Sequence, residues 1–142
     1  MSNDIVEKFK HYYADLIVAD LSRLDEIYDN DIIFKDPVHQ VTGLVTLQDY
    51  FVELCGNLKI CRFEYLDILR SENSAYIKWN MHYRHPKLQS GKALTLKGVS
   101  HLQFDDRITF HEDVYDMGAM VYEHIPFVGA ATRMIKRRLA NH

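Results

Sequence analysis

His111 and Asp113 are the pair of residues whose types and spacing could do chemistry. They lie two residues apart in the run 107–115, which alternates like a β-strand, so their side chains and that of Tyr115 share one face. An aspartate beside a histidine favours the imidazolium form and holds the ring, which suits acid–base work. If the strand instead lies at the edge of a sheet, the same residues form a surface ion pair. The alternation alone leaves both interpretations open.

The motifs of nucleotide, serine hydrolase and zinc chemistry are absent from the sequence. No P-loop, GxGxxG or GxSxG segment occurs. Cys55 and Cys61 have no second Cys or His pair at zinc spacing, and both are expected to be free thiols. The formal net charge of −3 argues against a nucleic acid as the main partner. We therefore expect no metal, no cofactor and no nucleic acid.

The length and hydropathy of the chain predict one domain spanning residues 1–142. Charged residues interrupt the N-terminal segment, which argues against a secretory signal. No stretch approaches the roughly 18 apolar residues that cross a bilayer. A cytoplasmic location is the expectation that follows.

The first half of the chain has the pattern of helices around one short strand. Apolar residues recur at helical spacing in three segments, which are 4–19, about 20–28 and 46–54. The β-branched and aromatic run 32–35 reads as a strand, and Asp36-Pro37 closes it because proline lacks the donor that a central strand needs.

The second half of the chain has the pattern of antiparallel strands. Four long alternating runs, 59–69, 74–85, 92–104 and 107–115, are separated by turn signals. Alternation places Trp79 and Met81 on the inner face of their strand and Ser100 on the inner face of the next, whereas His82 and His101 face outward. Helices followed by hairpins indicate an α+β fold with helices on one face of a curled sheet.

The segment 32–51, IIFKDPVHQVTGLVTLQDYF, resembles the part of ketosteroid isomerases in which a short strand ends in Asp-Pro-Val before a loop, a glycine and an amphipathic helix. Upstream, Tyr12 lies at the spacing of that family's pocket tyrosine, and Asp20-Leu21 matches its helix junction. The element order over about residues 4–116 is similar to the wider nuclear transport factor 2-like superfamily, which includes SnoaL-like cyclases. The resemblance implies a cone-shaped, curved antiparallel sheet with three N-terminal helices packed in its concave face.

The resemblance also implies roles for single residues. Asp36 lies where the isomerases keep their proton-shuttling carboxylate, and Tyr12 where they keep an oxyanion-hole hydroxyl. Ser100 lies where their second carboxylic acid would be. A hydroxyl is the weaker donor, so steroid isomerisation of the familiar kind is not expected.

The same alignment turns the last strand toward the cavity of the cone. His111, Asp113 and Tyr115 then face the cavity, and Trp79 and Met81 complete its lining. The first hypothesis is an enzyme of the isomerase, cyclase or hydratase type that acts on a small hydrophobic molecule by cofactor-free acid–base catalysis. The alternatives are a non-catalytic domain that binds a small ligand and a protein-interaction domain, since this fold hosts all three.

Residues 117–142 extend beyond what the isomerases carry and are expected to be helical over 127–140. Basic residues lie opposite the apolar stripe of this helix, namely Arg133, Lys136, Arg137 and Arg138. The helix is expected to cap the open end of the cone or to cover the sheet of a partner subunit. Contact with an anionic membrane is the alternative that we favour least. We expect a homodimer formed through the outer face of the sheet.

Overall fold

The computed structural model describes residues 4–86, 91–116, 134–135 and 137–140. Its helical elements and strands follow the chain in the order α1 (Ile5–Tyr13), η1 (Leu21–Glu26), β1 (Tyr28–Lys35), β2 (Gln40–Thr42), α2 (Leu44–Gly56), β3 (Ile60–Arg70), β4 (Ser74–Arg84), β5 (Leu94–Phe104) and β6 (Ile108–Tyr115). The described part of the chain is therefore mixed α+β, with helices mainly in the first half, as the sequence pattern predicts.

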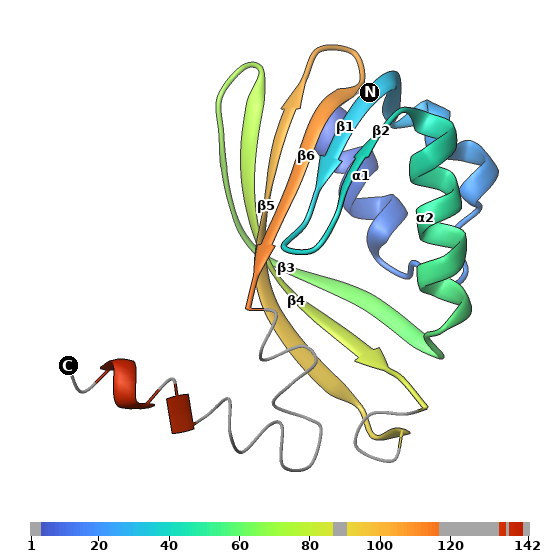
Figure 1. Ribbon diagram of the computed structural model, residues 1–142. Helices are drawn as coiled ribbons and strands as arrows, with labels where there is room; N and C mark the ends of the chain where they lie inside the picture. Colours follow the sequence, from blue (N-terminus) through green and yellow to red (C-terminus); the bar gives the residue numbers. More distant parts are fainter. Residues whose placement is uncertain (1–3, 87–90, 117–133, 136, 141–142) are drawn as a thin grey trace.

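All of the strands join one six-stranded sheet in the order β2-β1-β6-β5-β4-β3. The sheet bends strongly, and α1 and α2 lie on its concave side (Figure 1). Neighbouring strands run antiparallel, except that β1 pairs with β6 in parallel. The expected cone with helices in its concave face is confirmed, and the parallel pair is a feature that the sequence pattern did not predict.

The parallel pair brings the end of β1 beside the chemistry-bearing part of β6. Phe34 pairs with His111 and Lys35 pairs with Glu112. Asp36 follows Lys35 in the chain, and Asp113 follows Glu112. Because the two strands are parallel, both aspartates lie toward the same end of the sheet. An antiparallel pairing would run the two strands in opposite directions and would not give this correspondence.

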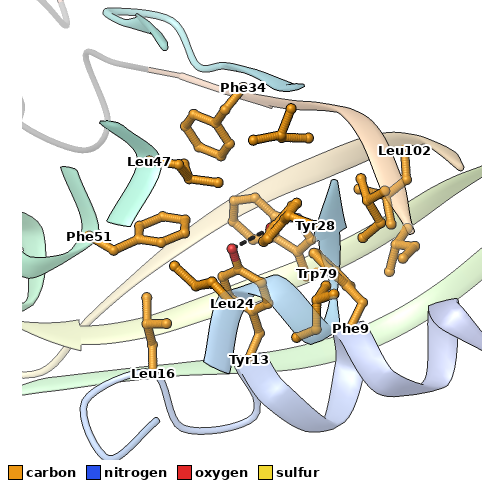
Figure 2. Close-up of a cluster of buried hydrophobic side chains, with 14 of the residues drawn as sticks. Phe9, Tyr13, Leu16, Leu24, Tyr28, Phe34, Leu47, Phe51, Trp79 and Leu102 are labelled. Atoms are coloured by element: carbon orange, nitrogen blue, oxygen red, sulfur yellow. Dashed lines mark hydrogen bonds between the residues drawn. The ribbon is translucent and has the colours of Figure 1, made fainter. Parts of the chain in front are cut away.

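The inner face of the sheet carries the core. Every second residue of β4 is buried, as the alternation predicts, and the set is Ala75, Ile77, Trp79, Met81 and Tyr83. Phe9 and Tyr13 of α1 pack on this side together with Leu47 and Phe51 of α2. Figure 2 shows the rings of Phe9, Tyr13, Phe51 and Trp79 in one cluster, with the hydroxyl of Tyr13 directed toward Tyr28.

The outer face of the sheet carries the two histidines that were expected there. The His82 ring lies 3.1 Å from a carboxylate oxygen of Glu64. The His101 ring stacks on Tyr76 with ring centroids 4.3 Å apart. Neither ring turns toward the core.

Helix α1 ends at Tyr13, earlier than the predicted segment 4–19. The backbone N–H of Leu16 donates to the carbonyl of Cys61 at 2.9 Å, so the chain leaves the helix to contact the start of β3. Tertiary pairing here overrides an apolar pattern that continues at helical spacing.

Strand β1 begins at Tyr28, a residue expected to end the second helix. The parallel partner explains the difference, because Ile108 of β6 donates to the carbonyl of Ile27 at 2.8 Å and Tyr28 pairs with Ile108. The short strand β2 was not predicted. It leads into Gly43, which has φ = 94°, a conformation that favours glycine, and which precedes α2.

The C-terminal segment is helical at residues 134–135 and 137–140, within the predicted helix 127–140. Positions 127–133 and 136 lie outside the described residues. The apolar side chains Met134, Ile135 and Leu139 are exposed. Among the described residues, no helix has the length and apolar character needed to cross a membrane.

Candidate active site

Asp113 is held by a chain of hydrogen bonds that starts at Trp79. The indole Nε1 of Trp79 donates to Ser100 Oγ at 2.8 Å, and the Ser100 hydroxyl donates to Asp113 Oδ1 at 2.5 Å. The same carboxylate oxygen lies 2.6 Å from His111 Nε2. Strands β4, β5 and β6 are neighbours in the sheet. Inward-facing side chains on adjacent strands therefore come together here.

His111 is also fixed from its other side. Its Nδ1 lies 2.7 Å from the Tyr28 hydroxyl, which lies 2.6 Å from the Tyr13 hydroxyl. The histidine is 1% exposed, and the Phe34 ring stands edge-on to it at 4.8 Å between centroids. Both ring nitrogens therefore have partners, as a buried polar side chain requires.

Asp113 keeps one carboxylate oxygen available. Oδ1 accepts from Ser100 and contacts His111, whereas Oδ2 accepts no hydrogen bond from the described residues. The side chain is 16% exposed and lines a cavity. Contacts with an imidazole and a hydroxyl hold the carboxylate in place. The free oxygen can then take a proton from a bound molecule.

Asp36 forms a second polar group at the same cavity. Its Oδ2 accepts from the Tyr50 hydroxyl at 2.5 Å, and its Oδ1 accepts from the backbone N–H groups of Val38 and His39 at 2.8 and 2.7 Å. The side chain is 3% exposed. Burial, followed by this hydrogen bond to Asp36, raises the pKa of Tyr50 well above its ordinary value. Asp36 thus shapes the turn after β1 and also places a buried carboxyl group at the cavity.

The cavity has a volume of about 60 Å³. Aromatic and aliphatic side chains form its walls around the two aspartates, and the full set is Tyr13, Leu16, Phe34, Asp36, Tyr50, Phe51, Leu54, Leu58, Cys61, Phe63, Trp79, Met81, Leu96, Asp113 and Tyr115. An outer groove of about 470 Å³ shares Tyr50, Leu54 and Tyr115 with the cavity. These three side chains therefore lie where the inner cavity meets the outer groove.

Most of the residues that the sequence singled out come together here. Asp36, Asp113, Tyr115, Trp79 and Met81 line the cavity. His111 and Ser100 lie directly behind Asp113 and are bonded to it. The His111–Asp113 pair thus faces inward, and the alternative of a surface ion pair on an edge strand does not hold.

Tyr12 is the exception among the predicted residues. Its hydroxyl donates to the carbonyl of Asp20 at 2.9 Å, and its ring lines a separate surface groove with Lys8 and Arg23. Successive residues of a helix point about 100° apart, so Tyr12 and Tyr13 cannot share a direction. The structure brings Tyr13 to the cavity and leaves Tyr12 outside it.

Three tyrosines of the site were not singled out from the sequence. Tyr13 and Tyr50 have the helical spacing of ordinary packing residues, and Tyr28 fell in a segment expected to be helical. A predicted strand that began at Tyr28 would have identified this residue. A strand that starts there directs the Tyr28 side chain into the core, together with Ile32 and Phe34. No sequence signal links Tyr50 to Asp36.

The described residues contain no group of three or more His, Cys, Asp or Glu side chains that could hold a metal ion. The polar side chains of the site form a hydrogen-bonded chain around Asp113 and a separate pair between Asp36 and Tyr50. The carboxylates in this arrangement can take up and return a proton.

Comparison with known proteins shows the family of the chain. A model of the SnoaL-like domain matches residues 9–111 of the chain. None of the curated proteins compared with the chain matches it.

Several solved structures are similar to the chain. A Shewanella putrefaciens protein provisionally named a SnoaL-like polyketide cyclase is 22% identical, with 82% of this chain and 90% of that chain covered and a TM-score of 0.69. A hypothetical protein from Catenulispora acidiphila with a ketosteroid isomerase-like fold, solved in complex with trimethylamine, is 12% identical, covers 87% and 93%, and has a TM-score of 0.73. TerC, co-crystallised with polyporic acid, is 16% identical, covers 84% and 95%, and has a TM-score of 0.68.

At these identities the structural likeness shows the fold alone, and it agrees with the curved sheet and the concave-side helices. The match to the domain model covers more than half of the chain, from α1 to the middle of β6. The chain belongs to the SnoaL-like domain family and has a nuclear transport factor 2-like fold.

Proposed function

We propose that the chain binds a small molecule in its cone and acts on it by general acid–base catalysis, as an isomerase, cyclase or hydratase. The observation that carries the proposal is Asp113, whose Oδ1 is held by His111 and Ser100 while Oδ2 is left for the cavity. A carboxylate fixed in this way, inside walls that are mostly apolar, is a suitable base for a carbon acid.

The proposed reaction begins when Asp113 Oδ2 takes a proton from a carbon next to a carbonyl group. The electron pair of the broken C–H bond moves onto the carbonyl oxygen, where a hydrogen-bond donor must stabilise the charge. Tyr115 lines the cavity and can supply this donor in the place expected of Tyr12. Burial, and then the charges of Asp36 and Asp113, raise the pKa of Tyr115, so its hydroxyl keeps its proton. Asp113 then returns the proton to the product.

The relatives of known structure support a small-molecule ligand. The Catenulispora protein was solved with trimethylamine and TerC with polyporic acid, and both share the fold of this chain. The shared cone is the reason to look for the ligand of this chain inside it.

The test is proton exchange in heavy water with the small ketones acetone, butanone and cyclopentanone, followed by NMR. The wild-type protein should exchange the protons next to the carbonyl of at least one ketone, and Asp113→Asn should slow this at least about 100-fold because it removes the base. Asp31→Asn, an exposed position of β1, is the matched control and should exchange at the wild-type rate. Equal rates for wild type and Asp113→Asn would overturn the proposal.

A non-catalytic carrier is the second candidate function, because the hydrogen bonds within the site would also fix the shape of a binding pocket. Native mass spectrometry of the protein as purified separates the two candidates. A molecule that stays bound unchanged, together with no proton exchange in the first experiment, would favour the carrier.

We also propose that the protein forms a homodimer through the outer face of the sheet. Leu69, Tyr76 and Val114 are exposed there, at 75%, 49% and 57%. Exposed apolar side chains gathered on one face are typical of an interface. Sedimentation velocity at increasing concentration should detect the dimer, and Tyr76→Glu should shift it to monomer. A wild-type protein that stays monomeric would overturn this proposal.

A further inference from the structure

The inner cavity has negative charge and no cation in its walls. Asp36 and Asp113 line it, and no lysine, arginine or histidine is found among its described lining residues. His111 lies behind Asp113 and can offset one charge when it is protonated. Asp36 then still leaves the cavity negative. An anionic ligand would be repelled, because the interior screens charge poorly.

The walls of the cavity are rich in aromatic rings. About half of the lining residues are aromatic, including Trp79, Phe34 and Tyr50. The face of an aromatic ring attracts a cation, most strongly when both are removed from water. Rings and carboxylates therefore favour the same kind of ligand, which is a positively charged one.

Asp113 sets a second requirement on the ligand. Its Oδ2 accepts no hydrogen bond from the described residues. A neutral apolar molecule that filled the cavity would leave this oxygen without a donor, at a substantial free-energy cost. A ligand that brings an N–H with a positive charge removes the cost, since a hydrogen bond between charged groups is the strong kind.

The volume limits the size of the charged group. A cavity of about 60 Å³ holds about four to six waters at roughly 10–15 Å³ each. An alkylammonium group with a few carbons fits this space. The outer groove of about 470 Å³, reached past Tyr50 and Tyr115, has room for the remainder of a larger molecule.

We infer that the inner cavity binds the alkylammonium group of its ligand, with an N–H of that group donating to Asp113 Oδ2 and the aromatic rings around the carbon atoms. The inference rests on the proposed function for the place of the ligand, and it names the class of substrate.

The test compares isopropylammonium, isopropanol and acetate, which are similar in size and carry positive, zero and negative charge. Binding is followed by calorimetry and by the fluorescence of Trp79, the single tryptophan, which lines the cavity. Isopropylammonium should bind at least about 10-fold more tightly than isopropanol, and acetate should not bind. Added salt should not abolish the preference, because the carboxylates are largely buried.

Two variants assign the effect to the cavity. Asp113→Asn removes the charged acceptor and should remove most of the preference for isopropylammonium over isopropanol. Asp36→Asn lowers the negative charge without touching that contact and should weaken binding by a smaller factor. Asp31→Asn, which is exposed, should bind as the wild type does.

Equal affinity for isopropylammonium and isopropanol in the wild type, or tighter binding of acetate, would overturn the inference. This result is independent of the proton-exchange experiment. A protein that exchanges ketone protons through Asp113 but does not prefer the cation keeps the proposed function and loses the ligand class. A protein that prefers the cation but catalyses no exchange keeps the ligand class alone.

Discussion

At the scale of the residue, Tyr28 connects two groups that would otherwise be buried without partners. Its hydroxyl lies between the Tyr13 hydroxyl and His111 Nδ1, at 2.6 and 2.7 Å. Tyr28 itself is fully buried. His111 in turn holds Asp113, so the orientation of the proposed base depends on a tyrosine that never touches the ligand cavity.

Tyr28→Phe should lower the free energy of unfolding by about 1–3 kcal/mol, because it leaves His111 Nδ1 and the Tyr13 hydroxyl unpaired in the core. Urea unfolding monitored by circular dichroism measures this loss. Tyr12→Phe is the matched control. The Tyr12 hydroxyl donates to an exposed carbonyl, to which water can donate in the variant. The free energy of unfolding should therefore change by less than about 0.5 kcal/mol. Equal losses in the two variants would contradict the role given to Tyr28.

The two tyrosines also show what the sequence can predict at this scale. His111, Asp113 and Tyr115 were assigned to one face because strand alternation has a period of two, and the resemblance to the isomerases indicated that this face points inward. The sequence pattern of a helix does not decide in this way whether Tyr12 or Tyr13 faces the cavity. Which of them faces the cavity depends on how α1 lies against the sheet, and that is set by contacts such as the one between Leu16 and Cys61.

At the scale of the element, β4 and β5 fit together through a small residue opposite a large one. Gly98 pairs with Trp79 in the register of the two strands. A Cβ added at Gly98 would collide with the Trp79 ring, with Cζ2 only 2.6 Å away. The missing side chain therefore makes room for the indole that donates to Ser100 and lines the cavity.

Gly98→Ala should lower stability by about 1–3 kcal/mol through overpacking and should displace Trp79. The fluorescence spectrum of Trp79 reports the displacement directly. Gly56→Ala is the control, since nothing lies within 4 Å of a Cβ there and the position ends α2, where alanine is the better helix former. Its stability should be unchanged or higher. A wild-type spectrum and stability in Gly98→Ala would refute this account of the packing.

The long strands were the most predictable elements. Strands β3 to β6 each alternate over eight residues or more, and the predicted runs match them to within a few residues. The parallel contact between β1 and β6 was not predictable from local pattern, because it joins residues about 80 positions apart. That contact places Asp36 near Asp113, so the sequence predicted the members of the site better than it predicted their arrangement.

At the scale of the whole molecule, buried and partly buried tyrosines make the stability of the fold depend on pH. Burial raises the pKa values of Tyr13, Tyr28, Tyr50, Tyr65 and Tyr115 above the ordinary value of 10.0. Burial likewise raises the pKa of the Cys61 thiol to about 12. In the unfolded chain these groups would ionise near their ordinary values, while the folded protein keeps them protonated.

Stability should therefore be complete below about pH 9 and should fall as the pH rises past about 10, where the unfolded chain binds fewer protons than the folded one. The absorbance of the tyrosinate band and the circular dichroism signal, recorded together on titration with base, test this. Part of the tyrosinate signal should appear only as the fold is lost. Complete ionisation with the secondary structure intact would show that the hydroxyls are not enclosed.

Tyr65 allows a sharper version of the same test. Its hydroxyl is buried without a hydrogen-bond partner among the described residues, and burial is the main cause of its raised pKa. Tyr65→Phe removes an unpaired polar group, so it should raise stability at neutral pH by up to about 1 kcal/mol. It should also move the alkaline transition to higher pH, because one fewer group gains from unfolding. Tyr28→Phe removes an equally buried hydroxyl but breaks two hydrogen bonds, and it should lower stability at neutral pH. A loss of stability in both variants would mean that the Tyr65 hydroxyl has a partner in solution, such as a water molecule within the core.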